Sequence, residues 1–227
     1  MIAPAIPMLV GMLELQDRMN RKINPNWLKA EYPFLRAVLV EAAEAMDHYG
    51  WKWWKSQAPN IPQLRIELVD IWHFVLSHYL VRAGGNVASA AEMIICDWAD
   101  VDSISVGGET FNLQEMDVVR KLELLAALSC VRKPSLPLLR VLFDDCGLTP
   151  DDLYREYVSK NVLNHFRQDF GYKSGTYFKT WDGYEDNEHL ASIASTLNSN
   201  SPDLPSVLYD ELKKKYEALQ SAGKLST

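Results

Sequence analysis

The chain has 227 residues, of which 48% are hydrophobic and 23% are charged. This length and composition predict a globular protein with a sizeable core, built as one generous domain or as one domain with a subdomain. The formal net charge of −7 argues against nonspecific binding of nucleic acid, which needs a basic surface. It leaves room for an anionic small ligand held by a local cluster of basic residues.

Cysteine usage and the first residues of the chain bear on its location. Cys96, Cys130 and Cys146 are odd in number and lack Cys-x-x-Cys spacing, which predicts buried thiols in a reducing compartment, with neither a disulfide framework nor zinc. Residues 1–10 are apolar but contain two prolines and no basic lead-in, unlike a signal peptide. No run of about 18 apolar residues is present to span a membrane. We therefore expect a soluble, cytoplasmic protein with no membrane partner.

Helical periodicity dominates the chain. It predicts helices over residues 8–22, 35–49, 64–80, 87–99, 114–128, 136–144, 150–167 and 205–222. The segment 64–80 is apolar nearly all round, so we expect a central, buried helix there. Thr149 is the expected N-cap of the seventh helix, and Pro150 suits its first helical position. These patterns predict an all-α fold.

The segments between the helices differ in character. Residues 169–189 are dense in Gly, Tyr, Lys and Asp and have no clear period, which predicts an ordered functional loop. Residues 196–205 are rich in Ser, Asn and Pro and are expected to form a flexible linker. No set of strands with a period of two stands out, and no Gly-x-x-x-x-Gly-Lys phosphate loop is present.

Two pairs of acidic residues, Glu41-x-x-Glu44 and Glu67-x-x-Asp70, lie in apolar helical segments. Residues three apart on a helix point the same way. By itself, the first pair also suits a solvated helix face. The second pair lies in the predicted buried helix, where carboxylates need a partner or a cation. Together the four carboxylates predict a divalent metal site, and all-oxygen ligation favours Mg²⁺, with Mn²⁺ as the alternative.

A second cluster combines basic, amide and aromatic side chains. Its members are Lys160, Asn164, Arg167, Tyr172, Lys173, Tyr177 and Lys179. Such donors suit a polyphosphate, because Arg makes bidentate contacts and Lys supplies a point charge. The alternative is a solvated loop in which the donors pair with Asp169, Asp182, Glu185 and Asp186. A carboxylate–metal site elsewhere in the chain favours the polyphosphate, because the metal would bridge phosphate oxygens.

Several segments carry a family resemblance. They are Leu15-Gln16-Asp17, Glu41-Ala-Ala-Glu44, Gly50-Trp-Lys-Trp-Trp-Lys55, Glu67-Leu-Val-Asp70-Ile-Trp-His-Phe74, and residues 160–179 with Glu185-Asp186-Asn187. Together they resemble the dimeric, all-α dUTPases (dUTP/dUDP pyrophosphatases), relatives of the MazG-like nucleotide pyrophosphatases. The last stretch is specific to that family, whereas the acidic pairs place only the superfamily. The resemblance covers residues 12–190, although residues 87–145 match in helical character more than in motif.

The resemblance implies a role for each matched polar residue. Glu41, Glu44, Glu67 and Asp70 would ligate Mg²⁺, and Glu41 would also take the proton of the attacking water. The phosphates would be held by Lys160, Asn164, Arg167, Lys173, Tyr177, Lys179 and Asn187. We expect the loop over residues 172–187 to be mobile until nucleotide and Mg²⁺ bind.

The resemblance also implies how the nucleoside is recognised. Gln16 and Asn20 would hydrogen-bond the uracil edge, and Trp54 would stack on the base. Phe74 would pack where a ribose 2′-OH would otherwise lie. The neighbouring Trp53 also suits a position in the core, since most tryptophans pack there.

The implied activity is Mg²⁺-dependent hydrolysis of dUTP to dUMP and pyrophosphate, with dUDP giving dUMP and phosphate. Such an enzyme controls the dUTP level and supplies dUMP. The implied fold is a helical bundle of the all-α NTP pyrophosphatase type with a smaller mobile helical part. A catalytic domain over residues 1–195, with a helical subregion at 87–145, would precede a linker and charged helix at 196–227.

Family members are homodimers, and the apolar helix over residues 64–80 would suit their interface. Two other functions stay open at this point. One is a MazG-like pyrophosphatase of another specificity, such as dCTP, which would keep the four acids but not the Gly-Tyr-Lys-x-Gly-Thr-Tyr run. The other is a catalytically inactive helical regulator that binds nucleotides.

Overall fold

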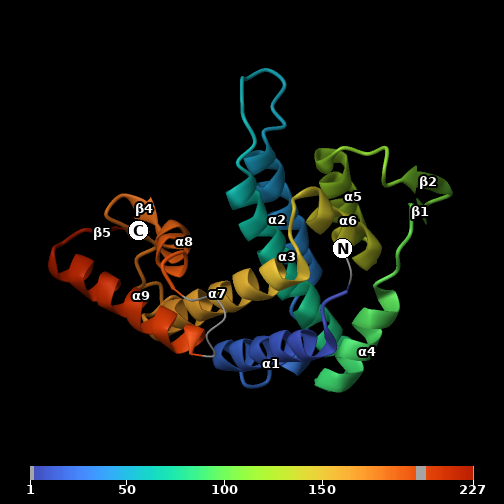
Figure 1. Cartoon of the computed structure of the whole chain (residues 1–227). Coiled ribbons are helices and arrows are strands. Elements are labelled where there is room, and N and C mark those ends of the chain that lie inside the picture. Colours follow the sequence, from blue (N-terminus) through green and yellow to red (C-terminus); the bar gives the residue numbers. More distant parts are fainter. Residues whose placement is uncertain (1–2, 198–202, 227) are drawn as a thin grey trace. The chain divides into compact units, whose positions relative to one another are not determined.

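The computed structural model of the protein describes residues 3–197 and 203–226 (Figure 1). Its helices are α1 (Ile6–Ile23), the 3₁₀ helix η1 (Trp27–Lys29), α2 (Phe34–Tyr49), α3 (Ile61–Arg82), α4 (Val87–Asp97), α5 (Val118–Cys130), α6 (Leu136–Asp145), α7 (Pro150–Asp169), α8 (Asp186–Ala194) and α9 (Leu204–Ser221). Its strands are β1 (Ser103–Val106), β2 (Glu109–Asn112), β3 (Thr180–Trp181), β4 (Tyr184–Glu185) and β5 (Leu225–Ser226). Helices dominate, which confirms the predicted all-α class. None of the described helices combines the length and apolar character that a membrane crossing requires.

The chain forms two compact units. Unit 1 consists of Met1–Asp17 and Asn26–Tyr154, and unit 2 consists of Arg18–Pro25 and Arg155–Thr227. Residues of α1 and α7 therefore belong to both units. This division does not coincide with the predicted boundary at residue 195. A packing unit need not equal a catalytic domain, so the predicted domain over residues 1–195 stays a prediction.

The predicted helices are present, and local chemistry sets their ends. The helix expected from residue 114 begins only at Val118, because the Asp117 side chain accepts a hydrogen bond from the Arg120 amide at 2.8 Å and caps it there. The predicted cap at Thr149 is confirmed: its Oγ1 accepts a hydrogen bond from the Asp152 amide at 3.1 Å. Gly50 ends α2 with φ of 87°, a left-handed conformation that suits glycine.

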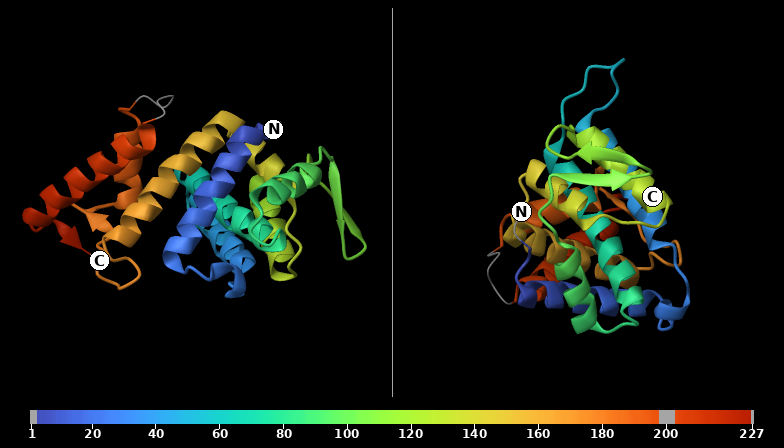
Figure 2. Two further views of the ribbon diagram at one scale, coloured as in Figure 1. Left: turned by 90° about the horizontal axis from the view of Figure 1, so that it is seen from below. Right: turned by 90° about the vertical axis from the view of Figure 1, so that its right-hand side faces the viewer.

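The helix α3 is the centre of unit 1. Leu64, Leu68, Ile71 and Trp72 are fully buried along it, which confirms the predicted central helix. It packs along α2 and also contacts α4, while α2 contacts α5 on another side (Figure 2). The apolar surface of α3 is thus covered by its own unit. This burial removes the reason for expecting a dimer interface on α3.

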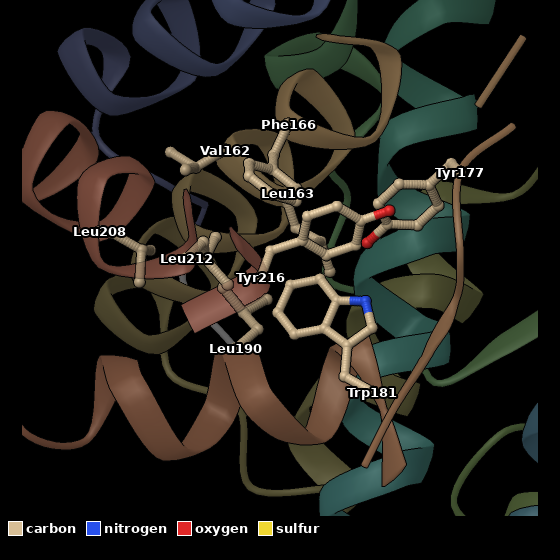
Figure 3. Close-up of a cluster of buried hydrophobic side chains, with 9 residues drawn as sticks. All are labelled: Val162, Leu163, Phe166, Tyr177, Trp181, Leu190, Leu208, Leu212 and Tyr216. Carbon is tan, nitrogen blue, oxygen red and sulfur yellow. The ribbon is translucent and has the colours of Figure 1, made fainter. Parts of the chain in front are cut away.

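The core of unit 2 is a cluster of aromatic and aliphatic side chains, drawn in Figure 3. Phe166 of α7 packs edge-to-face against Tyr177, Trp181 and Tyr216. Leu208, Leu212 and Tyr216 of α9 are buried in this cluster. The last helix, expected only as a charged terminal segment, therefore supplies part of a hydrophobic core.

Two short β elements were not predicted. In unit 1, β1 and β2 pair antiparallel across Gly107 and Gly108, both with positive φ, and form a hairpin that projects from the helices (Figure 2). Each strand has only four residues, too few for a period of two to stand out. In unit 2, β3 lies between β4 and β5 in a three-stranded sheet.

The segment over residues 169–189 is more regular than the predicted loop. It contains β3 and β4, and α8 already begins at Asp186. Glu185 and Glu188 form a capping box at that helix start, a Glu-x-x-Glu spacing that the sequence analysis missed. Most of the predicted linker at 196–205 lies outside the described residues. The predicted mobility of the smaller part of the fold stays a prediction.

The cysteine prediction is right for one residue of three. All three thiols are free, but only Cys146 is buried, and burial raises its pKa to about 11. Cys96, near the end of α4, and Cys130, the last residue of α5, are exposed.

Candidate functional site

Three of the four predicted metal ligands converge in unit 1. Glu41 of α2 and Glu67 and Asp70 of α3 bring carboxylate oxygens within 4.8 Å of one another. The convergence follows from the packing of α2 along α3 and from the three-residue spacing of Glu67 and Asp70. Glu44 is exposed one turn beyond Glu41 and lies outside this triad, so its role as a ligand stays a prediction.

The environment of this acidic triad disfavours the ionised form of its carboxyl groups. Burial, and then the charges of Asp70, Glu67 and Glu44, together raise the pKa of Glu41 to about 8. Glu67 is itself buried. Carboxylates held this close repel each other unless a proton or a cation lies between them. The oxygen donors and their spacing therefore fit a hard divalent cation such as Mg²⁺ or Mn²⁺.

A histidine that the sequence analysis missed contacts the triad. His48 Nε2 lies 3.3 Å from Glu67 Oε1, and the His48 side chain remains about one-third exposed. Its position seven residues after Glu41 places it two turns along the same face of α2, a spacing that would have indicated it. Side chains that hold a ligand carboxylate in this way orient it for metal binding.

A shallow surface groove of about 370 Å³ adjoins the triad in unit 1. Glu41 and Phe74 line it, together with aromatic and aliphatic side chains of the α2 region, namely Tyr32, Pro33, Phe34, Ala37 and Val40, and with Arg36. Phe74 stands one turn after Asp70 on α3. The structure thus places the predicted deoxyribose contact, Phe74, and a predicted metal ligand, Glu41, in one groove.

The predicted base-recognition residues have different environments. Gln16 is buried in unit 1, where its Oε1 lies 2.8 Å from Nδ1 of the buried His73, a contact that fixes the amide. Asn20 is buried in unit 2. Trp54 is 57% exposed in the segment between α2 and α3, with its ring edge-to-face on Trp51 and Trp53. Trp53 is 87% exposed, so the core position considered for it is wrong.

In unit 2, α7 carries Lys160, Asn164 and Arg167 of the basic cluster, and the start of α8 carries Asn187. Lys160 is buried, and its Nζ donates to Asn187 Oδ1 at 2.9 Å. Arg167 Nη1 donates to Asn164 Oδ1 at 3.3 Å. These four predicted phosphate contacts therefore form two hydrogen-bonded pairs, Lys160 with Asn187 and Arg167 with Asn164.

Asp186 organises this group, and the sequence analysis assigned it no role beyond a possible ion-pair partner. Its carboxylate is fully buried and accepts bonds from Arg167 Nε at 2.8 Å and Nη2 at 2.7 Å. It also accepts a bond from the Tyr177 hydroxyl at 2.7 Å. Burial, and then Asp186, raise the pKa of Tyr177 well above its usual value, so the phenol stays protonated as a donor. The bidentate geometry holds the guanidinium in a fixed orientation.

The two exposed lysines of the cluster take part in weaker contacts. Lys173 Nζ donates to the Ile23 carbonyl at 2.6 Å, within unit 2. Lys179 Nζ lies 3.1 Å from Glu185 Oε2, and both side chains are about half exposed. Exposed pairs of this kind are readily exchanged for an anionic ligand.

Comparison with known proteins agrees with this geometry. The family model described as dUTPase matches residues 8–172, and the chain belongs to this all-α dUTPase family. The match supports dUTP diphosphatase activity. It includes the acidic triad, Gln16, Phe74 and Arg167, and it ends before Tyr177 and the residues that follow. Comparison with curated individual proteins gives no match.

Proposed function

We propose that the protein hydrolyses dUTP to dUMP and pyrophosphate, and dUDP to dUMP and phosphate, in a Mg²⁺-dependent reaction. The observation that carries the proposal is the acidic triad of Glu41, Glu67 and Asp70 in a chain of the dUTPase family. Family membership gives the substrate, and the triad gives a donor set suited to a hard cation. Mn²⁺ is the alternative ion.

The acidic residues would hold the cation and prepare the water. Glu41, Glu67 and Asp70 would ligate Mg²⁺, with Glu44 as a further ligand. When bound, the ion would neutralise phosphate oxygens and stabilise the charge that develops on them. Glu41 would also accept the proton of the attacking water, because it is the member of the triad that lines the groove beside Phe74.

The donors of unit 2 bind the phosphates in this proposal. Arg167, held by Asp186, presents a preformed fork, and Lys160 adds a point charge. Asn164, Lys173, Tyr177, Lys179 and Asn187 supply the remaining contacts. These donors also stabilise the charge of the departing pyrophosphate.

The nucleoside is selected by a smaller set of residues. Gln16, fixed by His73, and Asn20 pair with the uracil edge, and Trp54 stacks on the base. Phe74, which lines the groove beside Glu41, packs against the deoxyribose and disfavours a 2′-hydroxyl. A site that hydrogen-bonds the uracil edge rejects cytosine, because the same protein groups would then lie unpaired.

One assay tests the proposal. The protein is incubated with Mg²⁺ and each deoxynucleoside triphosphate separately, and pyrophosphate release is measured, with EDTA as the control. We expect release from dUTP alone and none in EDTA. Equal release from dCTP would favour a MazG-like pyrophosphatase of broader specificity. Binding of dUTP without release would favour the inactive regulator.

We also propose that the protein forms a homodimer and takes no nucleic-acid partner. The mostly apolar groove on α2 and α5 supports an interface on this face of unit 1; it is lined by Leu39, Val40, Ala43, Met46 and Ala126, with Glu44 and Asp47. Light scattering after size-exclusion chromatography measures the mass directly. A monomer at micromolar concentration would contradict the dimer without affecting the proposed chemistry.

A further inference from the structure

The C-terminal segment Leu204–Ser226 lies beyond the region that the family model matches, yet it contacts the segment that carries Tyr177, Lys179 and Asp186. Leu208 and Leu212 of α9 are fully buried in the core of unit 2 (Figure 3). The segment is therefore an integral part of this unit. Several of its contacts fall on one short stretch, residues 177–182.

Tyr216 is the first point of contact. Its ring stacks on the ring of Tyr177, with centroids 5.5 Å apart and planes 8° apart. Its hydroxyl oxygen accepts a hydrogen bond from the Phe178 amide at 3.3 Å. Tyr177 in turn donates to Asp186, the carboxylate that holds Arg167. One tyrosine of α9 thus holds both the side chain of Tyr177 and the backbone that follows it.

The strand β5 is the second point of contact. It pairs antiparallel with β3, with Thr180 opposite Ser226 and Trp181 opposite Leu225. The Asp182 amide donates to the Lys224 carbonyl at 2.7 Å, and Lys224 Nζ lies 3.1 Å from the Asp182 carboxylate. The other edge of β3 pairs with β4, which leads directly into Asp186 and Asn187. Hydrogen bonding to β5 therefore fixes the turn that sets these two residues in place.

We propose that Tyr216 and the strand β5 are positioning elements for the phosphate contacts of unit 2, and so determine how tightly the enzyme holds the triphosphate. The inference rests on the proposed function, because it assigns the cluster around Asp186 to phosphate. Tyr216 acts through Tyr177 and Phe178. The strand β5 acts through Thr180 and Trp181, and the preceding Lys224 acts through Asp182. Loss of either loosens Tyr177, Lys179 and Asn187 without removing a phosphate donor.

Two variants of the full chain test the inference. Tyr216→Phe keeps the ring stacking and removes only the acceptor for the Phe178 amide. A chain ending after Gly223 removes β5 and Lys224, and with β5 the Leu225 side chain that packs against the core, but it keeps α9 and the buried core residues. We expect Tyr216→Phe to weaken binding of inorganic pyrophosphate, measured by calorimetry with Mg²⁺, by about fivefold, the size expected for one lost hydrogen bond. The shortened chain loses several contacts and should weaken it at least as much. Binding of deoxyuridine should not change, and KM for dUTP should rise more than kcat falls.

Tyr209→Phe is the matched control. Tyr209 lies on the same helix, packs against Phe166, and donates its own hydrogen bond to Asp169 at 2.9 Å. Loss of the Tyr209 hydroxyl weakens unit 2 but removes no contact to residues 177–182. The affinity for pyrophosphate should therefore stay at the wild-type value. A fall in affinity equal to that of Tyr216→Phe would mean that any loosening of the unit has this effect, and would overturn the proposed positioning.

A further variant separates the inference from the function on which it rests. Lys179→Ala removes a proposed phosphate contact directly. If Lys179→Ala weakens pyrophosphate binding while Tyr216→Phe and the shortened chain bind as the wild type does, the positioning role is wrong and the phosphate site stands. If Lys179→Ala and Arg167→Gln both leave the affinity unchanged, the phosphate site itself is wrong.

Discussion

The two functional clusters of this protein solve opposite electrostatic problems. In unit 1, Glu41, Glu67 and Asp70 gather negative charge, and burial and neighbouring carboxylates all raise the pKa of Glu41. In unit 2, the positive charge of Arg167 is paired with the buried carboxylate of Asp186. The acidic triad therefore offers a donor set suited to a cation. The basic cluster carries its own counter-ion and is organised before any ligand arrives.

This difference explains what each cluster contributes. A cluster of like charges favours binding of a cation, but the repulsion within it destabilises the folded protein when no cation is bound. A charge that is paired within the protein, such as that of Arg167, stabilises the fold and holds its donors in place before a ligand binds. Its attraction for an anionic ligand is weaker, because the partner carboxylate lowers the net positive charge. The same substitution, an acid to its amide, should accordingly have opposite effects on stability in the two units.

Glu67→Gln should have the largest effect. We expect turnover of dUTP to fall about a thousandfold, close to 4 kcal/mol of transition-state stabilisation, because a metal ligand is lost. The metal-free variant should nevertheless be at least as stable as the wild type, since one repelling charge is gone. Steady-state kinetics and thermal unfolding with and without Mg²⁺ measure the two effects. Glu92→Gln, on the exposed face of α4, is the control. Full activity in Glu67→Gln would contradict the assignment of Glu67 as a metal ligand.

Asp186→Asn should have the opposite effect on stability. Removing one partner of a buried pair leaves the Arg167 guanidinium poorly compensated, which costs about 3 kcal/mol. Asp182→Asn breaks the exposed pair with Lys224 and should cost below about 1 kcal/mol. Urea unfolding monitored by tryptophan fluorescence, with Trp181 in the affected core, gives both values. Equal costs for the two variants would mean that Asp186 is not the organising charge of the cluster.

His48→Gln probes how far the protein itself compensates the acidic triad. Since His48 contacts Glu67 at 3.3 Å, its loss should raise the Mg²⁺ concentration for half-maximal activity by about tenfold, as for other groups that orient metal ligands. Turnover at saturating Mg²⁺ should change little. His78→Gln, on α3, is the matched control. An unchanged Mg²⁺ requirement would show that His48 only lies near the triad.

Much of the helical fold, and part of each charged cluster, could be predicted from the sequence. Glu67 and Asp70 stood out because carboxylates are rare in a helix as apolar as 64–80, and this mismatch between residue and environment is visible without a structure. The helices were predictable because their periodicity and caps, such as Thr149, are local. The donors on α7 were found for the same reason, since Lys160, Asn164 and Arg167 share one helix face.

What the sequence did not predict depends on contacts between distant residues. Asp186 was one acid among several in a polar stretch, and only the fold makes it the buried partner of Arg167 and Tyr177. The part that α9 plays in the core was not visible in the sequence, because its many charged residues lower the mean hydropathy of the helix despite Leu208, Leu212 and Tyr216. The hairpin of β1 and β2 was missed because four-residue strands are too short to show alternation.

The smallest effect concerns a carboxylate of unit 2 whose environment is the reverse of that of Glu41. Burial alone would raise the pKa of Asp169, but hydrogen bonds from Lys22 and Tyr209, with the Lys22 charge, outweigh it and lower the pKa. A lowered pKa means that the ionised form is favoured in the folded state. The stabilising contribution of the ionised Asp169 is therefore present above the unfolded pKa near 3.8 and is lost as the pH falls through the lower folded pKa.

Tyr209→Phe removes one of the hydrogen bonds to Asp169, so it should destabilise the protein at pH 6 by less than about 1 kcal/mol, because Asp169 is partly exposed. The difference from the wild type in urea unfolding should shrink as the pH falls below 4. A difference that stayed constant down to pH 3 would place the effect in ring packing against Phe166 and not in the bond to Asp169.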